Sequence, residues 1–271
     1  MRFDREPCLV LSVRPYRETS VLCRVLLRNK GCISAVMKGV RGGRRVSELQ
    51  PFSVGLLSGF GRSTLLTATR FETETHHNLS GNQLALGFYI LEVINRVLTD
   101  FQAEPVIYDL ATQTLDSLAE QEERLTIEAT LRRFELLLLV QLGYGLDFQT
   151  PLDAVSPEQH TYFTFTAESG FTVARGQASG APDVLQTVGD TTENSRLPRE
   201  PNMFSAQQMQ RLAALCAFLH GGTALTQEGV NHLAGDLRTL QNLAQQQLEP
   251  LLGHEPLVSR ALWKAPSGGA S

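Results

Sequence analysis

The hydrophobic pattern of this chain changes its period once, close to Leu79, and this change limits the possible folds more than any other feature. Before it, apolar residues come in short β-rich runs that are separated by glycine-bearing turns. Five such runs are present: Cys8–Val13, Val21–Leu27, Cys32–Met37, Phe52–Leu57 and Thr64–Phe71. Five short strands in roughly eighty residues are typical of a small closed barrel, so residues 1–80 are predicted to form an OB-fold domain.

After Leu79 the apolar residues recur with the spacing of a helix. Three successive helices are predicted, over Leu84–Leu98, Pro105–Leu118 and Leu125–Leu142. The third carries leucines on more than one side, which indicates a deeply buried core helix. A fourth helix is predicted to begin at Ser205, a suitable N-cap residue. A fifth is predicted over Gly229–Leu248, and a last short helical turn over Leu257–Trp263. Residues 81–150 and 203–264 are therefore assigned to a helical domain.

Residues 151–202 interrupt the helical pattern. Tyr162–Thr166 and Gly170–Val173 are predicted to form one β-hairpin, and the stretch from Arg175 to Pro201 is predicted to be a mobile loop. The tail, residues 265–271, is predicted to be disordered. The predicted fold class is thus α+β and multidomain, with an N-terminal OB-fold β-barrel followed by a mainly α-helical domain that carries a small β-hairpin insertion.

The net charge of −4 conceals a strong asymmetry along the chain. Residues 1–80 carry 13 basic and 6 acidic residues, a net charge of +7, whereas residues 81–271 carry 11 basic and 22 acidic residues, a net charge of −11. An asymmetry of this size suggests that the two parts have different binding partners. The alternative is chance clustering on solvated surfaces.

Basic residues concentrate in Arg14–Arg45, where nine lysines and arginines accompany a single acidic residue, Glu18. Such a segment on a small barrel is expected to follow a phosphate backbone, and the glycines of Lys38–Arg45 let the main chain approach phosphates closely. The candidate nucleic-acid-binding residues are Arg14, Arg17, Arg24, Lys38, Arg41, Arg44 and Arg45. Tyr16, Phe52 and Phe60 are the aromatic residues available for base stacking, but core packing is predicted for the two phenylalanines.

The sequence contains no motif that indicates catalysis or a bound cofactor. The cysteines, Cys8, Cys23, Cys32 and Cys216, form no CxxC pair and are predicted to be buried thiols. The glycine-rich loop lacks the ending of a P-loop, and neither a nucleophile elbow nor an HExxH motif is present. Glu72, Glu74 and His76 would share one face of a strand, but their spacing is wide for one ion, which favours a solvated strand end. We therefore expect no catalytic residue, no metal and no cofactor.

Nothing in the sequence predicts a membrane span or a secretory signal. No run approaches the roughly 20 apolar residues that a spanning helix needs. The segment Met1–Pro7 carries charges of both signs and is not followed by an apolar core of the kind that signal peptides have. These features predict a cytoplasmic protein.

The third predicted helix carries an arginine in an apolar setting. Arg132 shares a stripe with Leu136 and Leu139, at spacings of four and seven residues. An arginine beside leucines is the chemistry that seats a peptide's C-terminal carboxylate next to an aromatic side chain. The alternative is an intramolecular ion pair with Glu128 or Glu135, which the spacing alone favours.

Several short motifs occur in an order and spacing that resemble the RecO family of bacterial recombination mediators. They cover nearly the whole chain: Arg14–Ser20, Lys38–Arg41, Leu49–Phe52, Leu131–Leu136 with Leu142–Gly145, and Leu251–Arg260. The resemblance implies an OB-fold that binds single- and double-stranded DNA, a helical domain and strand-annealing activity. It implies as partners RecR and the acidic C-terminal tail of single-stranded DNA-binding protein. Together with these partners, the protein would indirectly load RecA onto coated DNA. The resemblance also implies a cytoplasmic protein that is associated with the nucleoid.

The resemblance also bears on particular residues. It makes the seven basic residues named above candidates for DNA binding. It favours Arg132, with Leu136 and Leu139, as the site for the partner tail, in place of the intramolecular ion pair. Many family members carry a four-cysteine zinc site after the Gly-Tyr element, but residues 149–160 contain no cysteine, so no zinc is expected at that place.

Two other functional classes are alternatives to the mediator. One is an RNA-binding OB-fold protein of RNA metabolism, which would be expected to carry aromatic pairs on its strands, and this barrel is poor in them. The other is a metal-dependent nuclease that uses Glu72, Glu74 and His76.

Overall fold

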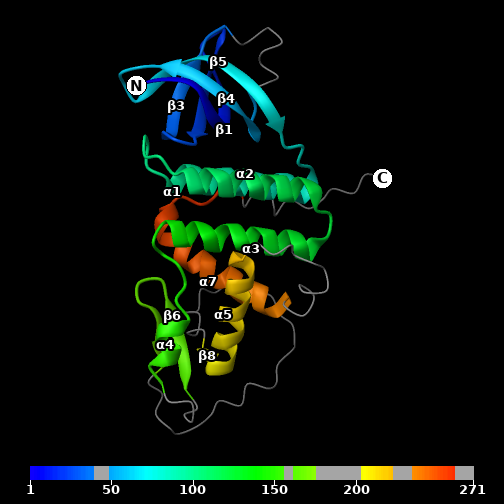
Figure 1. Cartoon of the computed structure of the whole chain (residues 1–271), viewed down its shortest axis with the longest axis vertical. Coiled ribbons are helices and arrows are strands. Elements are labelled where there is room, and N and C mark those ends of the chain that lie inside the picture. Colours follow the sequence, from blue (N-terminus) through cyan, green and yellow to red (C-terminus); the bar gives the residue numbers. More distant parts are fainter. Residues whose placement is uncertain (40–48, 156–160, 175–202, 222–233, 260–271) are drawn as a thin grey trace, which may run out of the picture.

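The computed structural model describes residues 1–39, 49–155, 161–174, 203–221 and 234–259. The described part is elongated, with a β-barrel at one end, a layer of helices in the middle and a small sheet flanked by helices at the other end (Figure 1). This arrangement confirms the predicted fold class, an OB-type barrel followed by a helical domain. Within the described residues, no helix is both long and apolar enough to cross a membrane.

The barrel closes in the strand order β1-β2-β3-β5-β4. Its strands are β1 (Arg2–Tyr16), β2 (Ser20–Leu27), β3 (Gly31–Met37), β4 (Ser53–Phe60) and β5 (Leu65–His76). All neighbouring pairs are antiparallel except β3 and β5, which run parallel. Successive side chains alternate between the inside and the outside, so cross-strand rows such as Val10, Val25 and Ile33 fill the interior.

β4 and β5 extend beyond the runs predicted from hydrophobicity, to Phe60 and His76 instead of Leu57 and Phe71. The last part of β5 is mostly exposed and polar, so the apolar signal that marks a strand is missing there. Its backbone nevertheless pairs with the start of β4, where His76 lies opposite Ser53. This extension carries the chain from the barrel to the helices.

Several of the described helices begin at residues that suit helix starts. The described helices are α1 (Gly81–Val97), α2 (Pro105–Glu120), α3 (Arg124–Gln141), the short α4 (Gln149–Asp153), α5 (Ala206–His220) and α7 (Ala234–Leu252). Pro105 is the first residue of α2, where a missing N–H is tolerated. The predicted N-cap Ser205 is confirmed, since its hydroxyl accepts from the N–H of Gln208 (3.2 Å) and its own N–H donates to the Gln208 side chain (2.8 Å).

The predicted hairpin is confirmed as β6 (Tyr162–Thr166) and β7 (Gly170–Val173), and a third strand, β8 (Met203–Ser205), was not predicted. β8 pairs with the other edge of β6 and leads directly into α5. The rings of Phe148, Phe165, Phe171 and Phe204 form an aromatic cluster under this sheet. The predicted mobile loop over 175–201, the start of the predicted helix over 229–233 and the tail over 265–271 lie outside the described residues.

The barrel and the helices share one hydrophobic core. On the outside of the barrel, Leu9, Leu26 and Cys32 form a cross-strand row that is fully buried against the helical layer. The connection between α1 and α2 adds to this contact, because Asp100 forms a parallel bridge with Cys32 and the Phe101 N–H donates to the Cys32 carbonyl (3.0 Å). The barrel is therefore attached through packing and main-chain pairing and is not a freely tethered module.

The C-terminal motif of the family resemblance is anchored on α1. The Glu92 carboxylate accepts from the N–H groups of Val258 (3.0 Å) and Ser259 (2.9 Å) and from the Ser259 hydroxyl (2.7 Å). Arg96, which pairs with Glu92, donates to the carbonyl of Pro256 (2.9 Å). This motif thus has a structural role in joining the end of the chain to the helical layer; the rest of the predicted turn, 260–263, lies outside the described residues.

Candidate nucleic-acid interface

Three of the predicted nucleic-acid-binding residues lie at one end of the barrel. Strand register places Pro15, Val21 and Met37 side by side, so the β1–β2 turn with Arg17 lies next to Lys38, which follows β3. Arg14, Arg17 and Lys38 are all exposed. Three other predicted residues follow shortly after Lys38 in the sequence and lie outside the described residues: Arg41, Arg44 and Arg45.

The β1–β2 turn is shaped to present Arg17. Its backbone is left-handed, with a φ of 55°, and its guanidinium lies over the ring of Tyr16 at 5.3 Å from the centroid. One face of the Tyr16 ring is therefore covered by a cation. The turn therefore offers positive charge at this end of the barrel, and the covered face of the Tyr16 ring is not open for base stacking.

Arg24 does not belong to this exposed set, in contrast to the prediction. Its side chain is 16% exposed and points to the helical layer, where it forms an ion pair with Asp100 and donates from Nε to Asn95 Oδ1 (2.8 Å). A guanidinium that is held by two partners of its own chain is not available to a phosphate without breaking them. The structure assigns Arg24 to the contact between the barrel and the helices.

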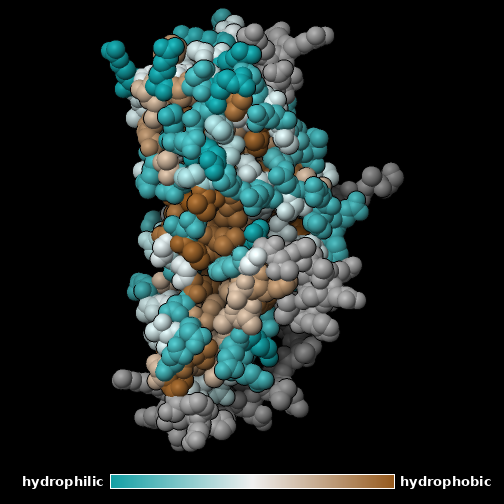
Figure 2. Space-filling view, viewed as in Figure 1, coloured by the Kyte–Doolittle hydropathy of each residue, from teal (hydrophilic) through white to brown (hydrophobic). Residues whose placement is uncertain are grey.

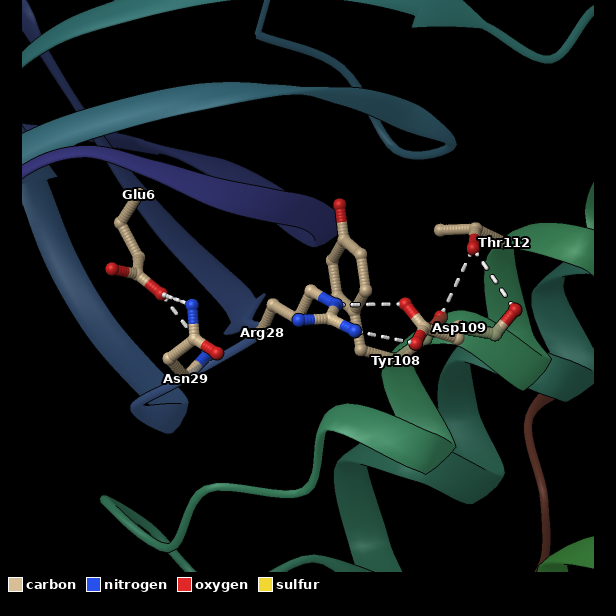
Figure 3. Close-up of polar contacts among 6 residues, drawn as sticks. All are labelled: Glu6, Arg28, Asn29, Tyr108, Asp109 and Thr112. Carbon is tan, nitrogen blue, oxygen red and sulfur yellow. Dashed lines mark hydrogen bonds and ion pairs between the residues drawn. The ribbon is translucent and has the colours of Figure 1, made fainter.

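Arg28, the residue that follows β2, also contacts the helical layer. Its Nε and Nη2 atoms donate to Asp109 Oδ1 (2.9 Å) and Oδ2 (2.8 Å), a bidentate ion pair between the β2–β3 turn and α2 (Figure 3). The Arg28 hydrogen bonds hold the pKa of the Asp109 carboxyl below its usual value. Next to it, the Glu6 carboxylate accepts from the main-chain and side-chain nitrogens of Asn29, which fixes the β2–β3 turn (Figure 3).

The two phenylalanines for which core packing was predicted behave differently. Phe52 is buried and packs edge-on against Phe88 of α1, with centroids 4.8 Å apart. Phe60, at the end of β4, is 54% exposed. The alternation along the strand explains the difference, because Gly55, Leu57 and Gly59 point inward and Phe60 falls on the outward set. This alternation was readable in the sequence, so it is the signal that could have identified Phe60 as a surface aromatic.

The predicted peptide site on α3 is not a surface. Arg132, Leu136 and Leu139 are all buried, and the Arg132 guanidinium forms an ion pair with Glu135, although not with the alignment of a regular hydrogen bond. Glu135 Oε1 also accepts from the hydroxyl of Tyr89 on α1 (2.7 Å). The intramolecular alternative therefore describes this pair, and none of the three side chains is exposed for a peptide to contact.

The candidate metal ligands near the end of β5 are not brought together. Glu72 accepts from Arg5 (2.6 Å) and pairs with Arg70 (3.0 Å), while His76 Nδ1 contacts the Ser53 hydroxyl (3.0 Å). Within the part of the chain that the structure describes, no group of three or more potential ligands has the arrangement of a metal site. The Glu72 carboxylate serves as a counter-ion for two arginines of the barrel surface.

The cysteines are placed as predicted, because all four are buried free thiols. Burial raises the pKa of Cys32 to about 11 and the pKa values of Cys23 and Cys216 to about 12. A thiol with such a pKa stays protonated near neutral pH, so these side chains are unsuited to nucleophilic chemistry or metal binding.

Comparison with known proteins identifies relatives over nearly the whole chain. Residues 1–75 match the family model described as Recombination protein O N terminal, and residues 79–186 match Recombination protein O C terminal. The DNA repair protein RecO of Cellvibrio japonicus is 32% identical over 97% of this chain and 98% of its own length. The protein of the same name from Pseudoalteromonas atlantica is 33% identical over 94% of this chain and 92% of its own length.

Proposed function

Because the chain belongs to the RecO family of DNA repair proteins, we propose that it acts as a recombination mediator. In this proposal the protein binds single- and double-stranded DNA and anneals complementary strands. With RecR it helps to load RecA onto DNA that is coated with single-stranded DNA-binding protein. It works by binding and not by catalysis, since annealing forms base pairs and breaks no covalent bond.

The observation that carries this proposal is the cluster of exposed basic residues at one end of the barrel. Arg14, Arg17 and Lys38 converge there, and three more arginines follow Lys38 in the sequence. The rest of the chain is acidic, so nucleic acid is attracted to the barrel and repelled by the helical body. The charge asymmetry thus supports the barrel as the end of the molecule that binds DNA.

Replacing Lys38, Arg41, Arg44 and Arg45 together with alanine is expected to weaken DNA binding roughly ten- to a hundredfold near 0.1 M salt. Each lost phosphate contact removes about 0.9 from the log–log salt slope for duplex DNA and about 0.7 for single strands. The measurement is fluorescence anisotropy of labelled oligonucleotides of several sequences over a series of salt concentrations. The loss is expected to be equal for all sequences.

The control for this variant is Arg124→Ala, which removes an exposed arginine from the helical body. It is expected to leave both the affinity and the salt slope unchanged. An unaltered salt slope in the quadruple variant would exclude the segment from the DNA interface. If the wild-type protein failed to bind DNA at all, the mediator function itself would be wrong.

The proposed protein partners are RecR and the acidic C-terminal tail of single-stranded DNA-binding protein. Since Arg132 is buried, we place the tail on the exposed apolar surface of α2 and α3, which Figure 2 shows as a continuous brown area in the middle of the molecule. α2 and α3 pack against each other, and their exposed apolar residues include Val106 and Val140. An exposed apolar area of this kind is suited to the apolar end of a peptide.

The variant Val140→Glu is expected to lower the affinity for a tail peptide roughly tenfold, because it puts a like charge in an apolar contact with an acidic ligand. Val140 is 44% exposed, so the fold should tolerate the change. The matched control is Val173→Glu on β7, where the valine is 41% exposed. Isothermal titration with the peptide distinguishes the two, and equal affinity for both variants would place the tail elsewhere.

A further inference from the structure

Phe60 is an aromatic side chain in an unusual place, more than half exposed on a strand of a basic barrel. A single exposed apolar residue is common on proteins and indicates nothing by itself. The neighbours of Phe60 make it informative. Strand register puts Arg2 opposite Phe60 on one side and Thr67 opposite it on the other, and Arg62 follows two residues later. Arg2 and Arg62 are both exposed, so one cation is a cross-strand neighbour of Phe60 and another is two residues away in the sequence.

The same outward row continues to the basic end of the barrel. Thr67 lies opposite Val36, Val36 opposite Leu22, and Leu22 opposite Arg14. Val36 is buried, Thr67 and Leu22 are partly exposed, and the two ends of the row, Arg14 and Phe60, are exposed. Four strand spacings of about 4.8 Å separate Arg14 from Phe60 along the curved surface, which is roughly 19 Å. No side chain of this row is acidic. A strand held by its phosphates at Arg14 would therefore follow a path without like charges toward the ring of Phe60.

Acidic residues near Phe60 have partners among the described residues. Glu72 is held between Arg5 and Arg70, and the Asp4 carboxylate accepts from the hydroxyl of Ser58 (2.7 Å). Four arginines, Arg2, Arg5, Arg62 and Arg70, thus accompany these two acids on this side of the barrel. The local charge remains positive around the exposed ring, which suits a polyanion whose bases are free to stack.

We propose that Phe60 stacks on a base of an unpaired DNA strand that crosses the outer row of the barrel from Arg14 to Arg2. Phosphates then contact the arginines and one base contacts the ring. In a duplex the bases are already stacked and paired, so the ring cannot reach them without unstacking. Phe60 thereby gives the protein a preference for unpaired strands, which the basic residues alone do not provide. This inference rests on the proposed binding of DNA by the barrel.

The test compares wild type with Phe60→Ala on three labelled ligands of equal length: a single-stranded oligothymidylate, a blunt duplex and an abasic phosphodiester strand. Loss of one stacked base corresponds to a roughly 5- to 150-fold weaker affinity. We expect a loss of this size for the oligothymidylate, and less than about twofold for the duplex and the abasic strand. The salt slope should not change, because stacking releases no counterions.

Two further variants make the result specific. Phe60→Trp keeps an aromatic face and should retain the affinity for the oligothymidylate, whereas Tyr162→Ala removes an exposed aromatic residue from β6, at the far end of the molecule, and should change nothing. Thermal unfolding of each variant confirms that the barrel is intact. Equal oligothymidylate affinity for Phe60→Ala and wild type, or an equal loss on all three ligands, would overturn the stacking role while leaving DNA binding by the barrel in place. Failure of wild type to bind any of the three would overturn both.

Discussion

Replacing Arg132 with alanine is expected to lower the free energy of unfolding by about 3–5 kcal/mol, the usual effect of removing one partner of a buried ion pair. The side chains of Arg132 and Glu135 are only 5% and 1% exposed. Without the guanidinium, the Glu135 carboxylate is left in the core without its cation, and water cannot replace it. The change should appear in urea denaturation, followed by circular dichroism, as a lower midpoint with an unchanged slope.

A double variant separates the loss of the pair from the burial of a lone charge. Arg132→Met combined with Glu135→Gln removes both charges and keeps an acceptor for the Tyr89 hydroxyl. Neutral groups of similar size often replace buried ion pairs without loss, so the double variant is expected to recover most of the stability. If Arg132→Ala unfolded like wild type but no longer bound the partner tail, the arginine would act in recognition and the structural role would be wrong.

Arg132 shows where sequence reasoning reaches its limit. The spacing of Arg132, Leu136 and Leu139 on one stripe is compatible with a peptide site and with a buried ion pair. The burial of Arg132 and the contact of Tyr89 on α1 with Glu135 decide between them, and neither can be read from the sequence. The family resemblance favoured a peptide-binding role for Arg132. The spacing alone favoured an ion pair with the carboxylate three residues away, and this is the contact that the structure shows.

The barrel was predictable because its signals are local. Short apolar runs and glycine-bearing turns mark the strands, and their alternation also fixes which residues point outward. The same charge count that identified the basic end could not exclude Arg24, because its partners Asn95 and Asp100 come from α1 and the connection that follows it. β8 was missed for a related reason, since a strand of three residues carries too few positions to show a period.

The contact between the barrel and the helices depends on a position that accepts only glycine. Gly31 begins β3 with a φ of +76°, and a Cβ atom added there would lie 2.0 Å from the carbonyl oxygen of Gln102. The clashing atoms belong to the main chain, so no side-chain rotation relieves them. The same connection donates the Phe101 N–H to the carbonyl of Cys32, which belongs to the buried row of Leu9, Leu26 and Cys32.

Gly31→Ala is therefore expected to destabilise the protein by more than about 3 kcal/mol, since the left-handed conformation alone accounts for about 1–2 kcal/mol and the displaced connection adds the loss of packing. The matched control is Gly170→Ala in the β6–β7 turn, where φ is +66° and nothing lies within 4 Å of an added Cβ. That variant measures the conformational effect without the clash, and urea denaturation of both isolates the difference. In Gly31→Ala the segment between α1 and α2 should also become more sensitive to limited proteolysis, because it no longer fits against β3. Equal destabilisation of the two variants would show that the connection between α1 and α2 moves aside freely. The barrel would then be held to the helices by the apolar row and the arginine ion pairs, and not by this connection.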